Sequence, residues 1–375
     1  MKIRVILAAI LGTSVVVAAF AGFLYTQLAA SLTRDAEESL RGLATQVDEE
    51  IAGTARDLAA RAELVAQMPP VRDALAANDR HAIIALLGGS YTALHSRYGL
   101  TNAQVNAAAS NTVLHRFHSR EAGDDFTRNR QIIVAAHGSN QAQMGVEIGA
   151  SGVRVRGAAP VGGATVLGSV EFGVELQPLL EALRARTNAD FATLIDARLM
   201  PAASNAAARL LGGLRGDSST DWPLMGRLQE ARGITLVKEP TFSFPELGGV
   251  PYGAVIIPLL DYSGAEIGVI VAAKSLAADQ RTLRRLAVAA IAGAMIAEIG
   301  IIGIILLLFR GLLLRPVAIL AEAVEELDAD KALVLPKPGT AAALDRLIRA
   351  VQGRRAARAA GAARAAGPAL AGDAT

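Results

Sequence analysis

The side chains best suited to chemistry are five basic residues within a stretch of about 40 residues: Arg116, His118, Arg130, Arg154 and Arg156. A guanidinium donates paired hydrogen bonds that match a carboxylate or a phosphate. Arg154 and Arg156 stand two apart in an expected strand and therefore share one face, which either lines a pocket or faces solvent. Glu147 and Glu171 offer charges that would neutralise these arginines instead. The pattern favours a small anionic or zwitterionic ligand.

Two acidic residues, Asp124 and Asp125, follow Gly123 and complete the candidate ligand-binding set. A carboxylate here can accept a hydrogen bond from a ligand's amine. It can also cap the helix expected from Thr127, as aspartate commonly does. We expect one of the two to act as the cap.

No group of residues forms a catalytic or metal-binding pattern, so we expect no enzyme, metal or cofactor. The chain has no cysteine, which excludes disulfides and thiolate ligands. His115 and His118 have opposite parity on a strand, so their rings point to opposite faces. The segment from Gly268 to Ser275 resembles a phosphate loop only superficially, because Ala273 precedes the lysine. A formal net charge of +2 argues against nucleic acid as a partner.

Two apolar segments, 5–26 and 286–309, are long enough to cross a lipid bilayer. The first contains no charge and would extend about 33 Å as a helix. A cleaved signal peptide is the alternative interpretation of that segment. A loop as long as 27–283 crosses a membrane largely regardless of its charge. We expect a bacterial inner (cell) membrane protein with two spans, a cytoplasmic N-terminus at 1–4 and a periplasmic or extracellular domain at 27–283.

The second apolar segment contains one acidic residue, Glu298, and three spaced glycines. A carboxylate at that depth costs about 3 kcal/mol unless it is protonated or faces a partner helix. It is either tolerated in a helix seam or part of signalling. Gly293, Gly300 and Gly303 would let two such helices approach closely, which predicts a homodimer.

Between the spans the pattern predicts an α+β domain that begins with a long helix. Apolar residues recur at three- and four-residue steps from Leu40 to Val65, and Pro69-Pro70 ends this stalk helix, placed at 27–68. Further helices are expected at 82–98, 127–137 and 179–186, with loop and helix over 202–232. Strands are expected at 113–117, 144–148, 153–159, 166–174, 190–195, 234–238, 252–260 and 266–273.

Two hairpins about 100 residues apart resemble each other. Each has a proline before its turn, Pro160 or Pro258, and a glycine early in the second strand, Gly168 or Gly268. Proline suits a strand end, where no ladder donor is needed. The echo predicts two copies of one small sheet-and-helix module.

The run from Leu114 to Asp125 (LHRFHSREAGDD), together with Arg130 and the glycine-rich strands from Gly145 to Gly173, resembles the double Cache sensory family of chemoreceptors and other membrane sensors. The similarity covers roughly 90–175, and 190–273 matches only as a generic module of this type. The resemblance implies two PAS-like antiparallel sheets, a distal module at 80–176 and a proximal module at 177–274. It also implies that the long first helix is their spine.

After the second span, Arg315-Pro316 opens a helix with coiled-coil spacing. Helix, connector and helix over 310–353 resemble a HAMP relay, but the usual acidic pair would fall at Ala342-Ala343 and is missing. Residues 354–375 form a low-complexity basic tail.

This order of elements predicts a transmembrane sensory receptor that binds a small ligand outside the membrane and signals across it, as chemoreceptors do. Its partners would be the bilayer, a second copy and a separate cytoplasmic signalling protein. Two alternatives stay open: a membrane-anchored interaction or scaffold subunit without a small-molecule ligand, and a receptor truncated before its output domain.

Overall fold

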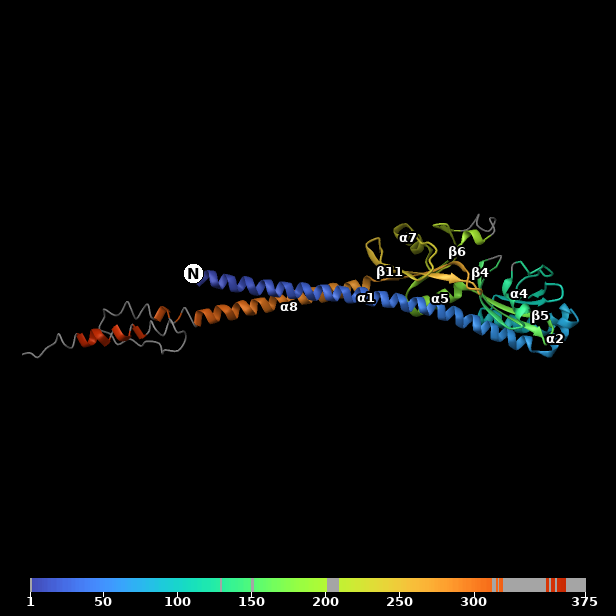
Figure 1. The fold of residues 1–375 in the computed structure, drawn as a ribbon, viewed down its shortest axis with the longest axis horizontal. Coiled ribbons are helices and arrows are strands. Elements are labelled where there is room, and N and C mark those ends of the chain that lie inside the picture. Colours follow the sequence, from blue (N-terminus) through green and yellow to red (C-terminus); the bar gives the residue numbers. More distant parts are fainter. Residues whose placement is uncertain are drawn as a thin grey trace, which may run out of the picture. The chain divides into compact units, whose positions relative to one another are not determined.

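The computed structural model describes residues 2–128, 130–149, 152–200 and 209–311, and beyond them 315, 317–319, 349–350, 352–354 and 356–361. It has the predicted α+β architecture, with a long first helix, two antiparallel sheets and a long last helix (Figure 1). The chain forms two units: a central unit, Ala29–Leu283, and a helical unit made of Met1–Leu28 and Arg284–Thr375. Most of the predicted relay at 310–353 and most of the tail at 354–375 lie outside the described residues.

One helix, α1 (Lys2–Ala66), contains both the predicted first span and the predicted stalk. Leu40, Val47 and Leu58 on its C-terminal half are at most 2% exposed, as the three- and four-residue periodicity predicts. The helix ends just before Pro69, because proline fits the first turn of a helix and not its interior. Pro69 accordingly opens α2 (Pro69–Ala76).

The next helix, α3 (Arg80–Tyr98), matches the predicted 82–98. Its N-terminus is capped by Asp79, whose carboxylate accepts hydrogen bonds from the backbone of His81 at 2.9 Å and of Ala82 at 3.0 Å. Gly99 ends it with φ +68°, a conformation that favours glycine.

The distal module contains a five-stranded antiparallel sheet in the order β2-β1-β5-β4-β3. Its elements are β1 (Asn102–Ala107), β2 (Thr112–Arg116), α4 (Gln131–Ser139), β3 (Gln143–Gly149), β4 (Gly152–Gly162) and β5 (Val166–Glu175). The α4 helix begins at Gln131, so the predicted start near Thr127 is wrong.

The proximal module begins with α5 (Leu176–Thr187) and contains a second antiparallel sheet, in the order β10-β11-β12-β6-β8-β7 with β9 paired to β11. Its other elements are β6 (Asp190–Asp196), the 3-10 helix η1 (Ala197–Leu199), β7 (Leu210–Leu211), β8 (Leu214–Ser219), α7 (Trp222–Arg232), β9 (Thr241–Ser243), β10 (Glu246–Leu247), β11 (Val250–Leu260) and β12 (Glu266–Ser275). The predicted strand at 234–238 is wrong. Ile234 is 2% exposed and packs in the core as irregular chain, and β9 pairs with β11 instead.

The two sheets share one strand order, which supports the predicted duplication. The run β2-β1-β5-β4 in the distal sheet corresponds to β8-β6-β12-β11 in the proximal sheet. Gly168 of β5 and Gly268 of β12 occupy matching places, since a Cβ on either would overlap a carbonyl oxygen of the neighbouring strand, that of Asn106 or of Leu194. The repeated glycine therefore has a steric cause in both modules.

The inner face of each sheet packs on α1, and the apolar core runs through both modules. Gly157 of β4 lies so close that a Cβ would overlap the backbone of Leu58 and Ala59. At Gly253 of β11 a Cβ would lie 3.2 Å from Leu40 Cδ1. Glycine is required at 157, where a Cβ would meet helix backbone, whereas at 253 a Cβ would have to displace the end of the Leu40 side chain.

The helix α8 (Ala277–Phe309) begins at the end of the central unit and contains the predicted second span. The most apolar stretches of α1 and α8 have mean hydropathies of 1.8 and 2.5, and none of their residues is buried. Both are long and apolar enough to cross a membrane. Within the helical unit, Ser14 Oγ donates a hydrogen bond of 2.6 Å to Glu298 Oε1, so the acidic side chain of one span is bound by the other.

We predict that Gly157→Ala lowers the free energy of unfolding by about 1–3 kcal/mol, because the added methyl must push α1 away from β4. Gly163→Ala is the matched control, since nothing lies within 4 Å of a Cβ at Gly163. Urea unfolding of the two variants measures the difference. Equal stabilities would show that the close approach of α1 and β4 is not a constraint.

Candidate functional site

The outer face of the distal sheet, opposite α1, is lined by buried polar side chains. Twelve polar or charged residues are buried in the described part of the chain. Eight of them belong to the distal module: Gln104, Asn106, Arg130, Glu147, Arg154, Arg156, Ser169 and Glu171. Seven stand at alternate strand positions and so share one face, and Arg130 joins them from the residue before α4, which packs over β3, β4 and β5.

Four of these residues form a charge cluster, which we define as Arg130, Glu147, Arg156 and Glu171. Arg130 Nε donates to Glu147 Oε2 at 2.7 Å, and its terminal nitrogen donates to Glu171 Oε1. Arg156 donates to the same Glu171 oxygen at 2.7 Å, and its Nε lies 3.4 Å from Glu147 Oε2. The two glutamates suspected of neutralising the arginines therefore pair with them, so the charge cluster has no net charge.

Glu147 also holds the N-terminus of α4. Its Oε1 accepts the backbone N–H of Ile132 at 3.0 Å, where a negative charge is favourable because the first N–H groups of a helix lack partners. The residue before α4, Arg130, makes no cap of its own. A change at the charge cluster therefore acts directly on the first turn of α4.

Burial and pairing shift the pKa values of the charge cluster in opposite senses. Burial raises the pKa of Glu171, but Arg130 and Arg156 outweigh it and bring that pKa below its ordinary value. Burial, assisted by the charge of Arg130, lowers the pKa of Arg156 to about 10. Both side chains therefore stay ionised at neutral pH. The second oxygen of Glu171, Oε2, is buried and has no hydrogen-bond partner among the described residues.

A second ion pair borders the charge cluster. Arg116 of β2 forms a bidentate pair with Asp124, with nitrogen–oxygen distances of 2.5 and 2.7 Å. Arg116 Nε also donates to Gln104 at 3.3 Å. From Gln104 a chain of hydrogen bonds continues to Asn106 at 2.9 Å and on to Ser169 at 3.1 Å. The polar face is thus linked by hydrogen bonds from β2 to β5.

His118 and Arg154 lie at the same end of this face and both contact Asn102. His118 Nε2 is 3.1 Å from Asn102 Nδ2, and burial lowers the pKa of the imidazole. Arg154 donates to Asn102 Oδ1 at 3.3 Å and pairs with Glu175 at 2.9 Å. Asp125 stands apart. Its carboxylate accepts from the backbone and hydroxyl of Thr127, at 2.8 and 2.7 Å, and so caps an exposed turn.

The corresponding face of the proximal sheet is filled by apolar side chains. Its core contains Leu194, Val269 and Val271, packed under Leu224 and Met225 of α7. Each of these five side chains is at most 1% exposed. In the proximal module, Asp196 at the end of β6 is the buried charged residue among those described, and it pairs with the exposed Arg198. A cluster of buried charges across several strands is therefore found in the distal sheet, although the two sheets share one strand order.

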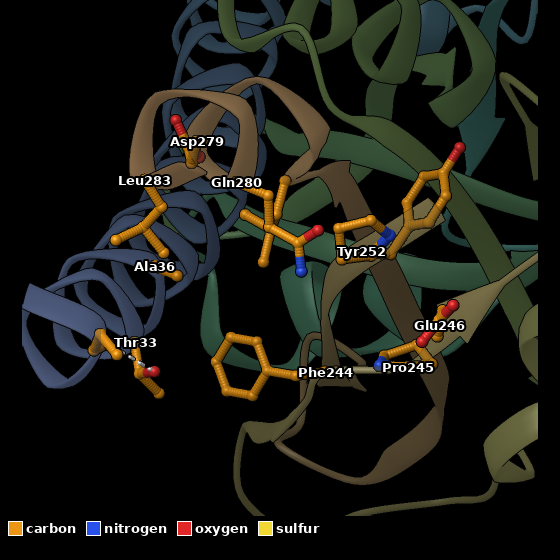
Figure 2. Close-up of a pocket in the computed structure, with 12 residues that line it drawn as sticks. Thr33, Ala36, Phe244, Pro245, Glu246, Tyr252, Asp279, Gln280 and Leu283 are labelled. Atoms are coloured by element: carbon orange, nitrogen blue, oxygen red, sulfur yellow. Dashed lines mark hydrogen bonds between the residues drawn. The ribbon is translucent and has the colours of Figure 1, made fainter. Parts of the chain in front are cut away.

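A cavity of about 390 Å³ lies between the proximal module, the α1 residues Ala29–Ala36 and the start of α8. Figure 2 shows the Phe244 ring pointing from its loop toward Thr33 of α1. The charged residues that line it, Glu246 and Asp279, are both acidic. This cavity is a poorer match for an anion than the arginine-rich distal face.

Inference from the sequence missed Gln104, Asn106 and Ser169 of the polar face. Gln104 and Asn106 alternate with Ala103 and Val105 on β1, which is the pattern of a half-buried strand. Because residues such as Asn and Ala have low β propensity, the alternation of polar and apolar residues in this segment was not recognised as a strand. Ser169 carried no signal of its own.

Comparison with known proteins bears on the central unit. The family model dCache_3, described as the double sensory domain of two-component sensor kinases, matches residues 33–280. No curated protein matches the chain.

Solved structures give weaker similarities. The ligand-binding domain of the Campylobacter jejuni chemoreceptor Tlp3, in complex with L-valine, is 12% identical over 68% of this chain and 97% of that one, with a TM-score of 0.43. The sensor domain of the V. cholerae histidine kinase DctB is 13% identical over 65% and 97%, with a TM-score of 0.39. The ligand-binding domain of the Pseudomonas aeruginosa amino acid chemoreceptor PctB, in complex with L-Arg, is 15% identical over 69% and 93%, with a TM-score of 0.38.

We predict that Glu171→Gln destabilises the central unit by about 3 kcal/mol, because it leaves two buried guanidiniums with one carboxylate. The double variant Glu171→Gln/Arg156→Met restores a neutral pair, Arg130 with Glu147, and should be clearly more stable than the sum of the two single changes. A double-mutant cycle by chemical unfolding measures this coupling. Additive effects would show that the four charges do not act as a unit.

The lowered pKa of Glu171 also predicts a pH dependence. In the unfolded chain this group titrates near its ordinary 4.5, so its stabilisation is present above that pH and is lost as the pH falls toward the folded pKa. The stability difference between the wild type and Glu171→Gln should therefore shrink between about pH 6 and about pH 3. Unfolding curves across this range test it, and a constant difference would contradict it.

Proposed function

Because the chain belongs to the dCache_3 family of double sensory domains, we propose that it is a membrane-spanning receptor whose distal module binds a small zwitterion or anion and whose helices carry the signal inward. The two apolar helices that flank the central unit, α1 and α8, support attachment to a membrane with this unit outside it. We place it in the bacterial inner membrane with the central unit periplasmic or extracellular. It would act by binding and not by catalysis.

The charge cluster carries the proposal. Buried ion pairs are a weak source of stability, and an apolar replacement of similar volume is often as stable or more so. The proximal module contains such an apolar replacement at the corresponding face. The four buried charges of the distal module are therefore better explained by ligand recognition than by folding.

The chemistry of the polar face fits a ligand that carries both charges. Arg116, Arg154 and Arg156 can donate to a carboxylate, because guanidinium groups match it in geometry. Glu171 Oε2 is a buried acceptor that has no hydrogen-bond partner in the described part of the chain, and an ammonium group can satisfy it. Amino acids are the simplest molecules of this kind.

Transmission would use the two spans. A ligand shifts the receptor only by binding one conformation better than another. The hydrogen bond between Ser14 and Glu298 joins α1 to α8 inside the helical unit, so the two spans can move as a pair. We propose that the segment at 310–353 receives this movement as a HAMP-like relay, that the receptor acts as a homodimer, and that a separate cytoplasmic protein reads the signal.

We predict that residues 29–283, which form a compact unit with their own core, are stabilised by a small zwitterion or carboxylate. Thermal-shift screening would begin with L-valine and L-arginine, the ligands of the Tlp3 and PctB structures, and extend to other amino acids, carboxylates and phosphate. Calorimetry of a hit should show affinity about tenfold or more weaker in Arg116→Ala and Arg154→Ala, which each lose charge-assisted hydrogen bonds.

Arg198→Ala is the matched control for these variants. Arg198 pairs with Asp196 at 2.5 Å in the proximal module, much as Arg116 pairs with Asp124 in the distal one. Its removal should leave the affinity unchanged. A broad screen without any stabilising compound, or binding that is unaffected by Arg116→Ala and Arg154→Ala, would argue against the distal site.

A further inference from the structure

The proximal module reaches into the distal module through the turn that joins β11 to β12. The backbone N–H of Tyr262 in this turn donates to the Val146 carbonyl of β3 at 2.9 Å. The backbone of β3 and that of the turn lie so close that a Cβ on Gly145 would be 2.7 Å from Tyr262 Cβ. Gly145 has φ +145°, which disfavours any other residue. The contact therefore depends on a residue of each module: Gly145 in the distal one and Tyr262 in the proximal one.

The turn that presents Tyr262 is stiffened by Asp261. Its Oδ1 accepts three hydrogen bonds, from the backbone N–H and hydroxyl of Ser263 at 2.8 and 2.7 Å and from the backbone of Ala265 at 2.9 Å. A turn closed in this way holds the direction of its central side chain. A displacement of the residues that contact Tyr262 would then move β11 and β12, because the turn between them is too stiff to deform.

Tyr262 touches the part of the distal module that the charge cluster controls. It packs against an apolar group formed by Val113, Phe126, Ile132 and Ile133. Ile132 is the residue whose N–H is bound by Glu147. The turn is bonded to Val146, the residue before Glu147 of the charge cluster, and burial, and after it the charge of Glu147, raises the pKa of the tyrosine. One helix end is thus held by Glu147 on one side and by Tyr262 on the other.

From Tyr262 the chain leads through β12 into α8, the helix that contains the predicted second span. β12 follows the turn, and its ten residues extend about 33 Å. It ends at Ser275, and α8 begins at Ala277. β12 pairs along its length with β11 and over most of it with β6, so it moves with the proximal sheet as one body.

A second contact joins the modules on the other side. Asp217 of β8 accepts the backbone N–H of Val153 at 3.1 Å, near the β3–β4 turn. The proximal sheet is therefore held to the distal module at two separate points.

We propose that Tyr262 is the positioning residue that couples the charge cluster to α8, and hence to the second span. This inference rests on the proposed function, because it assigns the route by which a conformational change at the distal site reaches α8. The coupling requires that the first turn of α4, which both the charge cluster and Tyr262 contact, adopts two alternative arrangements.

The absence of cysteine allows a direct test in the full-length chain in lipid nanodiscs. Thr33→Cys and Gln280→Cys place one thiol on α1 and one on α8, at the cavity of Figure 2. The initial rate of disulfide formation under a copper–phenanthroline oxidant reports their relative position, because the bond requires a narrow geometry. Glu147→Gln serves as a permanent change at the charge cluster, so no ligand is needed.

We expect Glu147→Gln to change the disulfide rate severalfold and Tyr262→Ala to abolish that response. Tyr262→Phe keeps the ring and should preserve the response. Gly145→Ala displaces the turn from the other side and should abolish it as well. Tyr98→Ala, on an exposed tyrosine of α3, is the matched control and should leave it intact. Circular dichroism confirms that each variant is folded.

A response that persists in both Tyr262→Ala and Gly145→Ala, or no response to Glu147→Gln in the otherwise unchanged chain, would overturn the coupling. A separate titration with L-valine and L-arginine distinguishes the two proposals. A compound that binds but leaves the disulfide rate unchanged refutes the coupling. A response to Glu147→Gln without binding of any screened compound refutes the ligand site and leaves the coupling standing.

Discussion

The central unit depends on one constraint: two sheets use the same helix as their inner layer. The C-terminal half of α1 buries its apolar face against both, in one continuous core. Gly157 and Gly253 set the approach, because any side chain there meets the helix or its leucine. Close packing of this kind resists gradual deformation. The side chains on the inner face of each sheet are therefore constrained by packing on α1, whereas those on the two outer faces are not.

The outer faces of the two sheets differ in the side chains that cover them. The proximal face is closed by leucine, valine and methionine under α7, as an ordinary core is. The distal face keeps four buried charges under a helix whose first turn depends on one of them, Glu147. A buried charge is tolerated only when it is paired, so the geometry of α4 is tied to the integrity of those pairs. The two modules share one strand order, and only the distal one has a sheet face lined by a cluster of buried charges.

Much of the fold could be predicted from the sequence, because its signals are local. The length of the apolar segments, the periodicity of α1 and the Val- and Ile-rich runs of β11 and β12 reflect short-range patterns. The run at 234–238 has a similar composition but is irregular chain in which Ile234 is the buried residue, so composition alone misled. The basic residues of the site were recognised by type, whereas their pairing with Glu147 and Glu171 depends on strand register. Tyr262 had no signal, because its role arises only where the two modules meet.

The pairing of the four charges sets the conditions for any molecule that enters between them. Arg130 and Arg156 are already neutralised, so an incoming carboxylate must displace a glutamate rather than fill a vacancy. The displaced glutamate remains buried, and an ammonium group on the same molecule is the means of neutralising it. Binding is then an exchange of ion pairs in which the buried charge sums to zero before and after. For the proposed ligand, electroneutrality would therefore favour a zwitterion over a simple anion, and the binding equilibrium would respond only weakly to ionic strength.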